Sequence, residues 1–148
     1  MQNSGQFMLS IKLIRQAIVA IVFFALLACS AKVDQSQVYT RNGLIRLKAT
    51  HELFSGYVKG KSREGYRLKR YAYIKHYKDG RLDGISKFFY DNGKLESVEP
   101  YKNGELDGTV IRYYENGQKK ASFSIKNGMR GGRAAEFFWD ENGKLIKG

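Results

Sequence analysis

The chain has 148 residues, 43% of them apolar, and this length leaves room for one modest domain. It holds 26 Lys and Arg against 14 Asp and Glu, and this excess favours acidic proteins, anionic lipid headgroups or nucleic acid as partners. Its single cysteine, Cys29, excludes an intramolecular disulfide and a multi-cysteine zinc site.

Residues 1–28 have the three-part layout of a secretory signal. Two cations, Lys12 and Arg15, precede an uncharged run at 17–28, and a small alanine stands just before Cys29. The run has about 12 residues, whereas a membrane-spanning helix needs about 20, so a signal is favoured over a permanent anchor. Both Met1 and Met8 fit as the start of such a signal.

The end of this segment, Leu26-Leu27-Ala28-Cys29, resembles the bacterial lipobox. The resemblance implies that a diacylglycerol is attached to the sulfur of Cys29 and that cleavage leaves this cysteine as the first residue. A plain secretory signal followed by an incidental cysteine is the alternative. Ser30 resembles the sorting signal for the outer membrane, which predicts a lipid-anchored protein facing the periplasm, or the cell membrane in a bacterium with one membrane.

Residues 29–38 are mostly polar and lack a periodic apolar pattern, so we expect a tether there and a folded domain at 39–148. Removing the two cations of the signal from the 26 leaves 24 cations against 14 acids, a charge of +10. The basic character therefore belongs to the exported part of the chain.

Glycine repeats every 24 residues in the predicted domain. The two series run in step, which indicates tandem structural repeats. They are Gly56, Gly80, Gly104 and Gly128, and Gly60, Gly84, Gly108 and Gly132.

Aromatic residues keep the same spacing, at Tyr66, Tyr90, Tyr114 and Phe138. A third glycine series, at Gly93, Gly117 and Gly143, ends on an interval of 26, which we ascribe to a two-residue insertion around 139–141. We expect Tyr90, Tyr114 and Phe138 to be structural positions of the repeat.

Six of the seven asparagines precede glycine, and Asp79-Gly80 is a seventh turn of the same kind. Asn-Gly and Asp-Gly are strong hairpin signals because both residues tolerate positive φ. Between them lie runs rich in β-branched and aromatic residues, such as 85–90, 94–101, 110–114 and 119–125. The pattern predicts an all-β fold, an elongated antiparallel sheet of tandem hairpins with about 24 residues per repeat.

The segment Tyr-Lys-Asn-Gly-Glu-Leu-Asp-Gly at 101–108, followed by Tyr-Tyr-Glu-Asn-Gly at 113–117, resembles the MORN repeat, and specifically its bacterial variant. The resemblance covers about residues 39–148 and is strongest from Tyr77 onward. Chains of this kind are often described as YwqK-type antitoxins. The family implies scaffolding or binding, through membrane-associated adaptors or the neutralisation of a toxin.

Residues that could perform catalysis or hold a cofactor are scarce. His51 and His76 are the only histidines and fall in different repeats, so a histidine-activated nucleophile has no convincing partners. The recurrent carboxylates stand beside turn glycines, where turn chemistry accounts for them. We expect no enzyme activity, no cofactor and no metal site.

These features together predict a non-enzymatic, lipid-anchored envelope protein whose repeat sheet binds a protein partner, acidic partners being favoured by the charge. The membrane is contacted through the lipid on Cys29. An immunity or antitoxin protein that neutralises a toxin is the alternative, and direct binding of the basic sheet to anionic headgroups is a third reading. Interleaved aromatic and basic residues could also stack bases, but an exported domain rarely meets nucleic acid.

Overall fold

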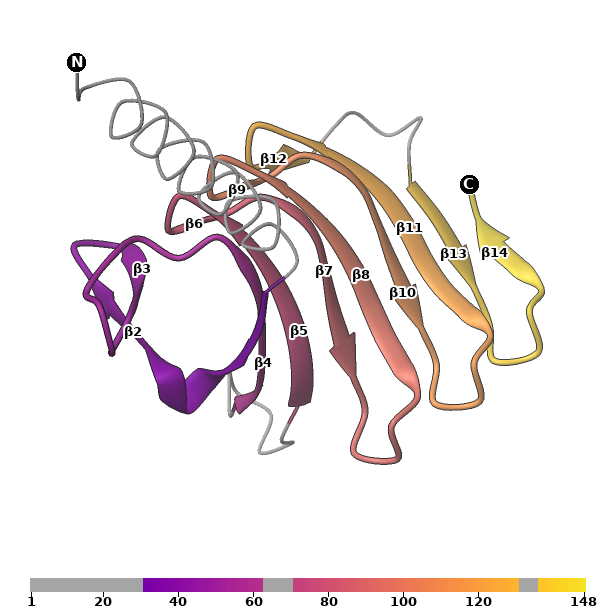
Figure 1. The fold of residues 1–148 in the computed structure, drawn as a ribbon. Coiled ribbons are helices and arrows are strands. Elements are labelled where there is room, and N and C mark those ends of the chain that lie inside the picture. The colour runs from indigo at the N-terminus through magenta and orange to yellow at the C-terminus, as the bar shows by residue number, and fades with distance from the viewer. Residues whose placement is uncertain (1–30, 63–70, 131–135) are drawn as a thin grey trace, which may run out of the picture. The chain divides into compact units, whose positions relative to one another are not determined.

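A computed structural model of the chain describes residues 31–62, 71–130 and 136–148, and these form strands joined by turns, with one short 3-10 helix (Figure 1). The chain divides into two compact units, Met1–Ala31 and Lys32–Gly148, and the second holds every strand. The prediction of an all-β fold is confirmed. Within the described ranges, no helix is long and apolar enough to cross a membrane. The predicted signal and Cys29 lie outside these ranges.

One sheet of twelve strands dominates the second unit. Nine of its strands lie side by side in chain order, each paired with the one before it, as successive hairpins require (Figure 1). Every pair is antiparallel except the first, which is parallel. In order these strands are β1 (Lys32–Asp34), β4 (Gly56–Ser62), β5 (Tyr71–Lys78), β7 (Gly84–Phe89), β8 (Leu95–Lys102), β10 (Gly108–Tyr113), β11 (Lys119–Lys126), β13 (Glu136–Trp139) and β14 (Leu145–Lys147).

Three two-residue strands fold back on the ends of the long ones. They are β6 (Arg81–Leu82) on β5, β9 (Glu105–Leu106) on β8, and β12 (Met129–Arg130) on β11. A separate hairpin is formed by β2 (Val38–Arg41) and β3 (Leu44–Leu47).

The segment expected to be a tether is ordered structure from Lys32 onward, which corrects the predicted boundary near residue 38. β1 adds to the edge of β4, and the 3-10 helix η1 (Gln35–Gln37) follows it directly. Asp34 and Gln37 close a capping box around this helix. The side-chain oxygen of Gln35 accepts hydrogen bonds from the Lys61 N–H at 3.0 Å and from the Tyr73 hydroxyl at 2.9 Å. These contacts depend on residues distant in sequence, so the polar composition of the segment does not reveal them.

Two kinds of turn alternate along the sheet. The first joins each long strand to its short return strand, and both central residues have positive φ, for example +52° at Asn103 and +95° at Gly104. This is the two-residue turn whose twist matches that of the flanking strands. The same geometry recurs at Asn42-Gly43, Asp79-Gly80 and Asn127-Gly128.

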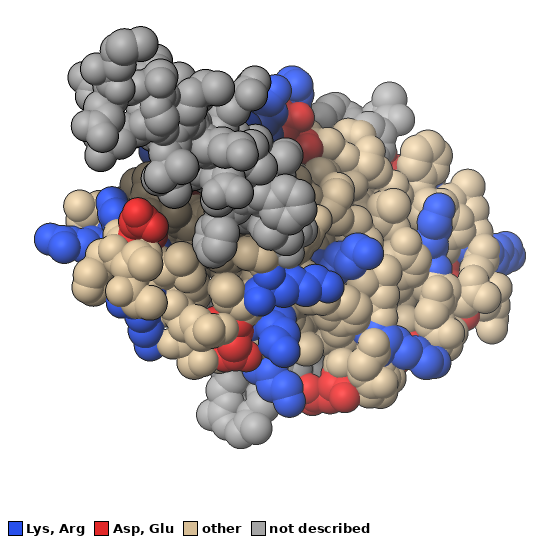
Figure 2. Space-filling model, in the orientation of Figure 1, with Lys and Arg blue, Asp and Glu red and all other residues tan. Residues whose placement is uncertain are grey.

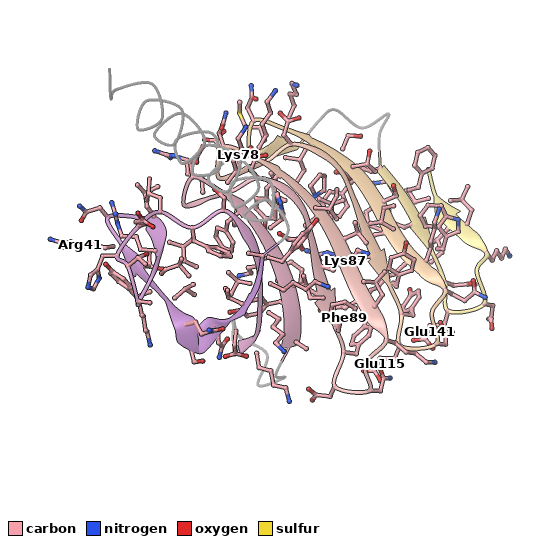
Figure 3. All side chains as sticks on the ribbon, in the orientation of Figure 1. Arg41, Lys78, Lys87, Phe89, Glu115 and Glu141 are labelled. Atoms are coloured by element: carbon pink, nitrogen blue, oxygen red, sulfur yellow. The ribbon has the colours of Figure 1, made fainter. Side chains whose placement is uncertain are left out.

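The second kind of turn lies at the opposite end of the strands. There the glycine N–H donates to the carbonyl three residues earlier, as Gly93 does to Tyr90 at 2.9 Å. Only the glycine has positive φ, and the asparagine oxygen accepts instead from the backbone, as Asn92 does from Lys94 at 2.9 Å. Both residues of the pair therefore have positive φ in the first kind of turn, and only the glycine has positive φ in the second. Figure 3 places Glu115 and Glu141 at these turns and Lys78 at the other end of the sheet.

The strand register relocates the predicted two-residue insertion. Phe89, Tyr113 and Trp139 occupy equivalent places, paired with Leu95, Lys119 and Leu145 across the same kind of bulged turn. The extra residues therefore lie upstream of β13, between Gly128 and Trp139, rather than around 139–141. Phe138 pairs with Ala121 as Arg112 pairs with Ser97, so it is the equivalent of Arg112, and Asp140 stands where Tyr90 and Tyr114 stand.

Candidate interaction surfaces

The repeat glycines occupy the first kind of turn and the strand starts that follow it. Gly80, Gly104 and Gly128 are the second residues of the two-residue turns. Gly84 and Gly108 begin β7 and β10 with φ of +92° and +125°. Gly56, of the same sequence series as Gly80, begins β4 instead of forming a turn. Gly132 lies outside the described residues.

Hydrogen bonds between repeats connect the two-residue turns into a ladder. The Gly104 N–H donates to the Leu82 carbonyl at 2.7 Å, and 24 residues later the Gly128 N–H donates to the Leu106 carbonyl at 2.9 Å. At the start of the ladder the Gly80 N–H donates to Phe54, and the Gly80 carbonyl accepts from Ile45 of the separate hairpin. The hairpin β2–β3 therefore docks on the first turn.

Tyr90 and Tyr114 connect repeats at the other end of the strands. The Tyr90 hydroxyl donates to the carbonyl of Tyr113 at 2.6 Å, and the Tyr114 hydroxyl donates to the carbonyl of Trp139 at 2.9 Å. Both side chains are half-buried. Phe138, the third aromatic of the series, packs against the core cluster of Val110, Ala121, Phe123 and Ile125.

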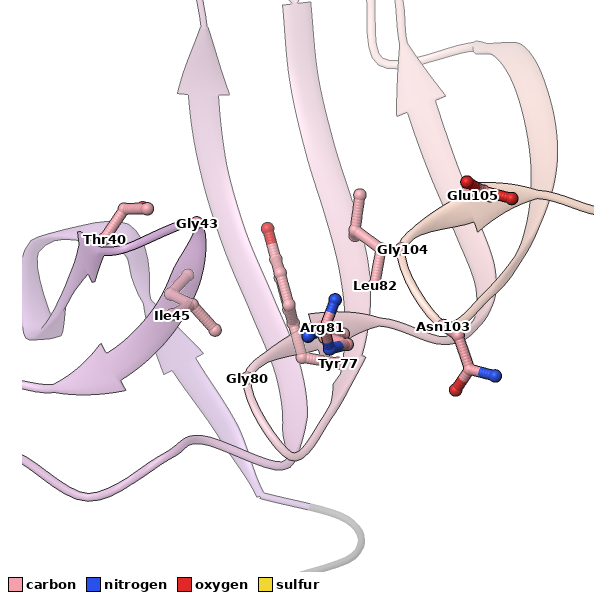
Figure 4. A pocket seen from close by; sticks show the side chains of 10 residues that line it. All are labelled: Thr40, Gly43, Ile45, Tyr77, Gly80, Arg81, Leu82, Asn103, Gly104 and Glu105. Atoms are coloured by element: carbon pink, nitrogen blue, oxygen red, sulfur yellow. The ribbon is translucent and has the colours of Figure 1, made fainter. Parts of the chain in front are cut away.

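A groove lies between the docked hairpin and the turn ladder (Figure 4). Thr40, Gly43 and Ile45 form one wall, Asn103 and Glu105 stand on the other, and Gly80 and Arg81 lie between them. Its volume is about 390 Å³. Arg81 and Glu105 carry opposite charges and are both exposed, so the groove presents no net charge from its own side chains.

The two faces of the large sheet differ in burial. Residues opposite one another in a sheet share a face, and the strand register connects Phe88, Ser97, Arg112, Ala121 and Phe138 across five strands. We call the face that carries this row the core face. It also holds five buried side chains that the register and the alternation along each strand place on this side, namely Val58, Ser86, Val110, Phe123 and Ile125.

We call the opposite side the open face. Its central row runs across seven strands through paired positions, namely Lys59, Ile74, Lys87, Val98, Ile111, Ser122 and Phe137. None of these seven side chains is buried, and Phe137 is 41% exposed. Ile85, two positions from Lys87 on the same face, is 47% exposed.

The lysine and arginine side chains of the two faces differ in their contacts with aromatic rings. On the core face, the Lys75 ammonium lies 4.7 Å from the Tyr73 ring centroid, and Arg112 and Lys147 lie over Phe123 and Phe138. On the open face, Lys59, Lys61 and Lys87 are exposed, and no aromatic ring of the described residues covers them. Figure 2 shows one face of the molecule, with lysine and arginine side chains gathered near its centre and fewer acidic groups among them.

Two carboxylates, Asp34 and Glu96, lie on the lysine side of the sheet, and Asp34 is in register with Lys59. The backbone N–H of Ser36 donates to it at 3.0 Å, and this hydrogen bond, with the nearby Lys59 charge, holds the pKa of Asp34 below its ordinary value. Asp34 therefore stays ionised and offsets part of the charge of Lys59. No acidic group of the described residues pairs in this way with Lys87.

The two histidines have structural partners. His51 is joined by a 3.0 Å hydrogen bond between its Nδ1 and the Tyr39 hydroxyl, within the β2–β3 region. His76 lies against the Tyr57 ring, with centroids 4.6 Å apart, and its Nδ1 donates to the Asp83 carbonyl. In the parts of the chain that the structure describes, no three His, Cys, Asp or Glu residues are grouped to hold a metal ion.

The carboxylates near turns form hydrogen bonds and an ion pair within turns and between neighbouring repeats. The Asp83 side chain accepts from the Asn103 N–H of the next repeat at 3.2 Å, and Asp140 accepts from the N–H groups of Asn142 and Lys144. Lys126 and Asp107 form an ion pair at 3.4 Å. These carboxylates hold turns and neighbouring repeats together.

The open face was not predicted as a site from the sequence. Alternation within β7 puts Ile85 and Lys87 on one side and Ser86 and Phe88 on the other. The polarity of these residues predicts the opposite assignment of faces, because a serine lies on the buried side and an isoleucine on the exposed one. Only the register with β5 and β8 assigns the faces.

Comparison with known proteins identifies the repeat. Residues 82–103 and 106–127 match the model of the MORN repeat variant family, and the two matches are offset by the predicted 24 residues. MORN repeats are non-catalytic modules that bind proteins or membranes. No curated protein and no solved structure matches the chain significantly.

Proposed function

We propose that this chain is a non-enzymatic, lipid-anchored envelope protein of bacteria whose repeat sheet is a protein-interaction module. The observation that supports the binding role most directly is the open face, a row of exposed and half-exposed side chains across seven strands. A sheet normally buries at least one face against its own side chains or another layer. Here the core face fulfils that need, and the open face is available to a partner.

The anchor rests on the sequence around Cys29, with its charged, apolar and small-residue regions in order. Acyl chains at about 0.8 kcal/mol per buried methylene hold a protein on a membrane without further contacts. Because β1 begins at Lys32, an anchored sheet stands close to the lipid surface: three residues span at most about 11 Å. Ser30 favours the outer membrane, with the sheet facing the periplasm.

The decisive experiment is metabolic labelling of the expressed chain with a palmitate analogue, followed by membrane fractionation. We expect labelling of the natural chain and none of Cys29→Ala. Ser30→Asp serves as the matched control, which retains the label but changes the membrane fraction in a bacterium with two membranes. An unlabelled natural chain recovered from the cytoplasm would exclude the anchor and favour the antitoxin reading.

A further inference from the structure

The open face combines apolar side chains and lysines in one continuous area. Ile74 pairs with Lys59 on one side and with Lys87 on the other, and Val98 follows on the next strand. Ile85, at 47% exposure, adds an apolar side chain beside Lys87. An apolar area with charged side chains at its rim is the usual composition of an interaction site.

The charge of this area is not balanced by the sheet itself. Asp34 lies in register with Lys59 and Glu96 lies two positions from Val98, but Lys32, Lys61 and Lys87 are exposed and form no ion pair with any described acid. The cations of the core face, by contrast, rest on aromatic rings of the same sheet. The open face therefore presents unpaired positive charge, which a negatively charged partner complements.

The shape of the surface favours a protein segment over a membrane as the binding partner. Lys32, Tyr57, Ile74, Ile85 and Lys87 line a hollow. A layer of lipid headgroups is flat over the width of such a hollow and contacts only its edges, whereas an apolar side chain of a protein can enter it. The lysines around it then lie within reach of carboxylates on the same segment.

We propose that the open face is the docking site for an acidic segment of a protein partner, with carboxylates at Lys32 and Lys87 and an apolar side chain against Ile85. This inference rests on the proposed binding role and names the face and the chemistry of the partner. It assigns no role to the groove at the turn ladder, which carries balanced charge.

The test uses the full chain in the form that the cell produces and a fluorescent synthetic peptide in which aspartates flank leucines. Comparison peptides replace the aspartates by lysine or the leucines by serine. We expect the acidic-apolar peptide to bind and both comparison peptides to bind more weakly. The charge reversal K32E/K87E should weaken binding by about tenfold or more, since two ion pairs are replaced by repulsion.

The matched control is K94E/K144E, which makes the same change in charge at two exposed lysines of the bulged turns. It should change the dissociation constant by less than about twofold, because these turns lie away from the open face. Ile85→Ser is a second variant without a charge change and should weaken binding as well. Circular dichroism verifies that each variant retains its strands.

Three outcomes would overturn the inference. These are no binding of the peptide, equal weakening by both charge reversals, and binding of phosphatidylglycerol vesicles that depends on Lys32 and Lys87 while the peptide does not bind. Palmitate labelling is read on the same preparations. Palmitate labelling without peptide binding would refute the docking site and leave the lipid anchor standing. Peptide binding without labelling would refute the lipid anchor and leave the docking site standing.

Discussion

The hydroxyl of Tyr114 offers a direct test of how one repeat holds the next. It donates a 2.9 Å hydrogen bond to the Trp139 carbonyl, 25 residues along the chain, and the side chain is half-buried. Tyr114→Phe removes this bond and leaves the ring in place. A hydrogen bond of this kind contributes about 1 kcal/mol net, and a carbonyl left without its partner in a half-buried place adds to the loss. We therefore expect the free energy of unfolding to fall by about 1–1.5 kcal/mol.

Truncation of the same side chain to alanine also removes the ring contacts. Full burial of an aromatic side chain is worth about 3–5 kcal/mol against alanine, and half-burial reduces this to about 2–3 kcal/mol. Tyr114→Ala should therefore cost about twice as much as Tyr114→Phe. The two variants together separate the hydroxyl bond from the packing of the ring.

Urea unfolding followed by fluorescence is suited to this series, because Trp139 is the only tryptophan and its own carbonyl is the acceptor. Tyr57→Phe is the control, since the structure gives the Tyr57 hydroxyl no hydrogen-bond partner, and it should change stability by less than about 0.5 kcal/mol. If Tyr114→Phe unfolds at the same urea concentration as the natural chain, the hydroxyl ladder does not stabilise the repeats. Equal losses for Tyr114→Phe and Tyr57→Phe would contradict the reasoning equally.

Three further substitutions test the glycines and the buried core. Gly104→Ala should lower the free energy of unfolding by about 1–2 kcal/mol, because φ is +95° although the added methyl group meets no other atom. Gly108→Ala should lower it further, because its methyl group would also lie 2.9 Å from Pro100. Thermal melts that reverse this order would refute the assignment of these turns. The Ser86 side chain is fully buried, and its hydroxyl has no hydrogen-bond partner among the described residues. Ser86→Ala should therefore raise stability by about 1 kcal/mol in urea unfolding, and a destabilised variant would contradict this reasoning.

The turns are the part of the fold that is most predictable from sequence. Asn103-Gly104 closes a two-residue hairpin because both residues tolerate positive φ, and this preference acts within four residues of chain. The same argument holds for the 24-residue period, since each repeat must place its turns at the same intervals to pair with its neighbour. The all-β class followed from these local signals, and the register of β7, β8, β10 and β11 agrees with it.

Other features depended on contacts that no local pattern contains. β1 at Lys32–Asp34 is polar and short, and it is a strand only because the edge of β4 accepts it. The insertion before β13 was misplaced because Phe138 and Trp139 are both aromatic, and only pairing with Ala121 and Leu145 fixes their places.

The sequence by itself determined the class of fold, the turns and the period, because each follows from the φ preferences and side chains of neighbouring residues. The tertiary structure decided which side of the sheet is buried. Ser86 lies in the core and Ile85 on the surface because the register with β5 and β8, and the packing of the whole sheet, outweigh the polarity of single side chains. The open face, and with it the proposed docking site, therefore came from the assembled sheet.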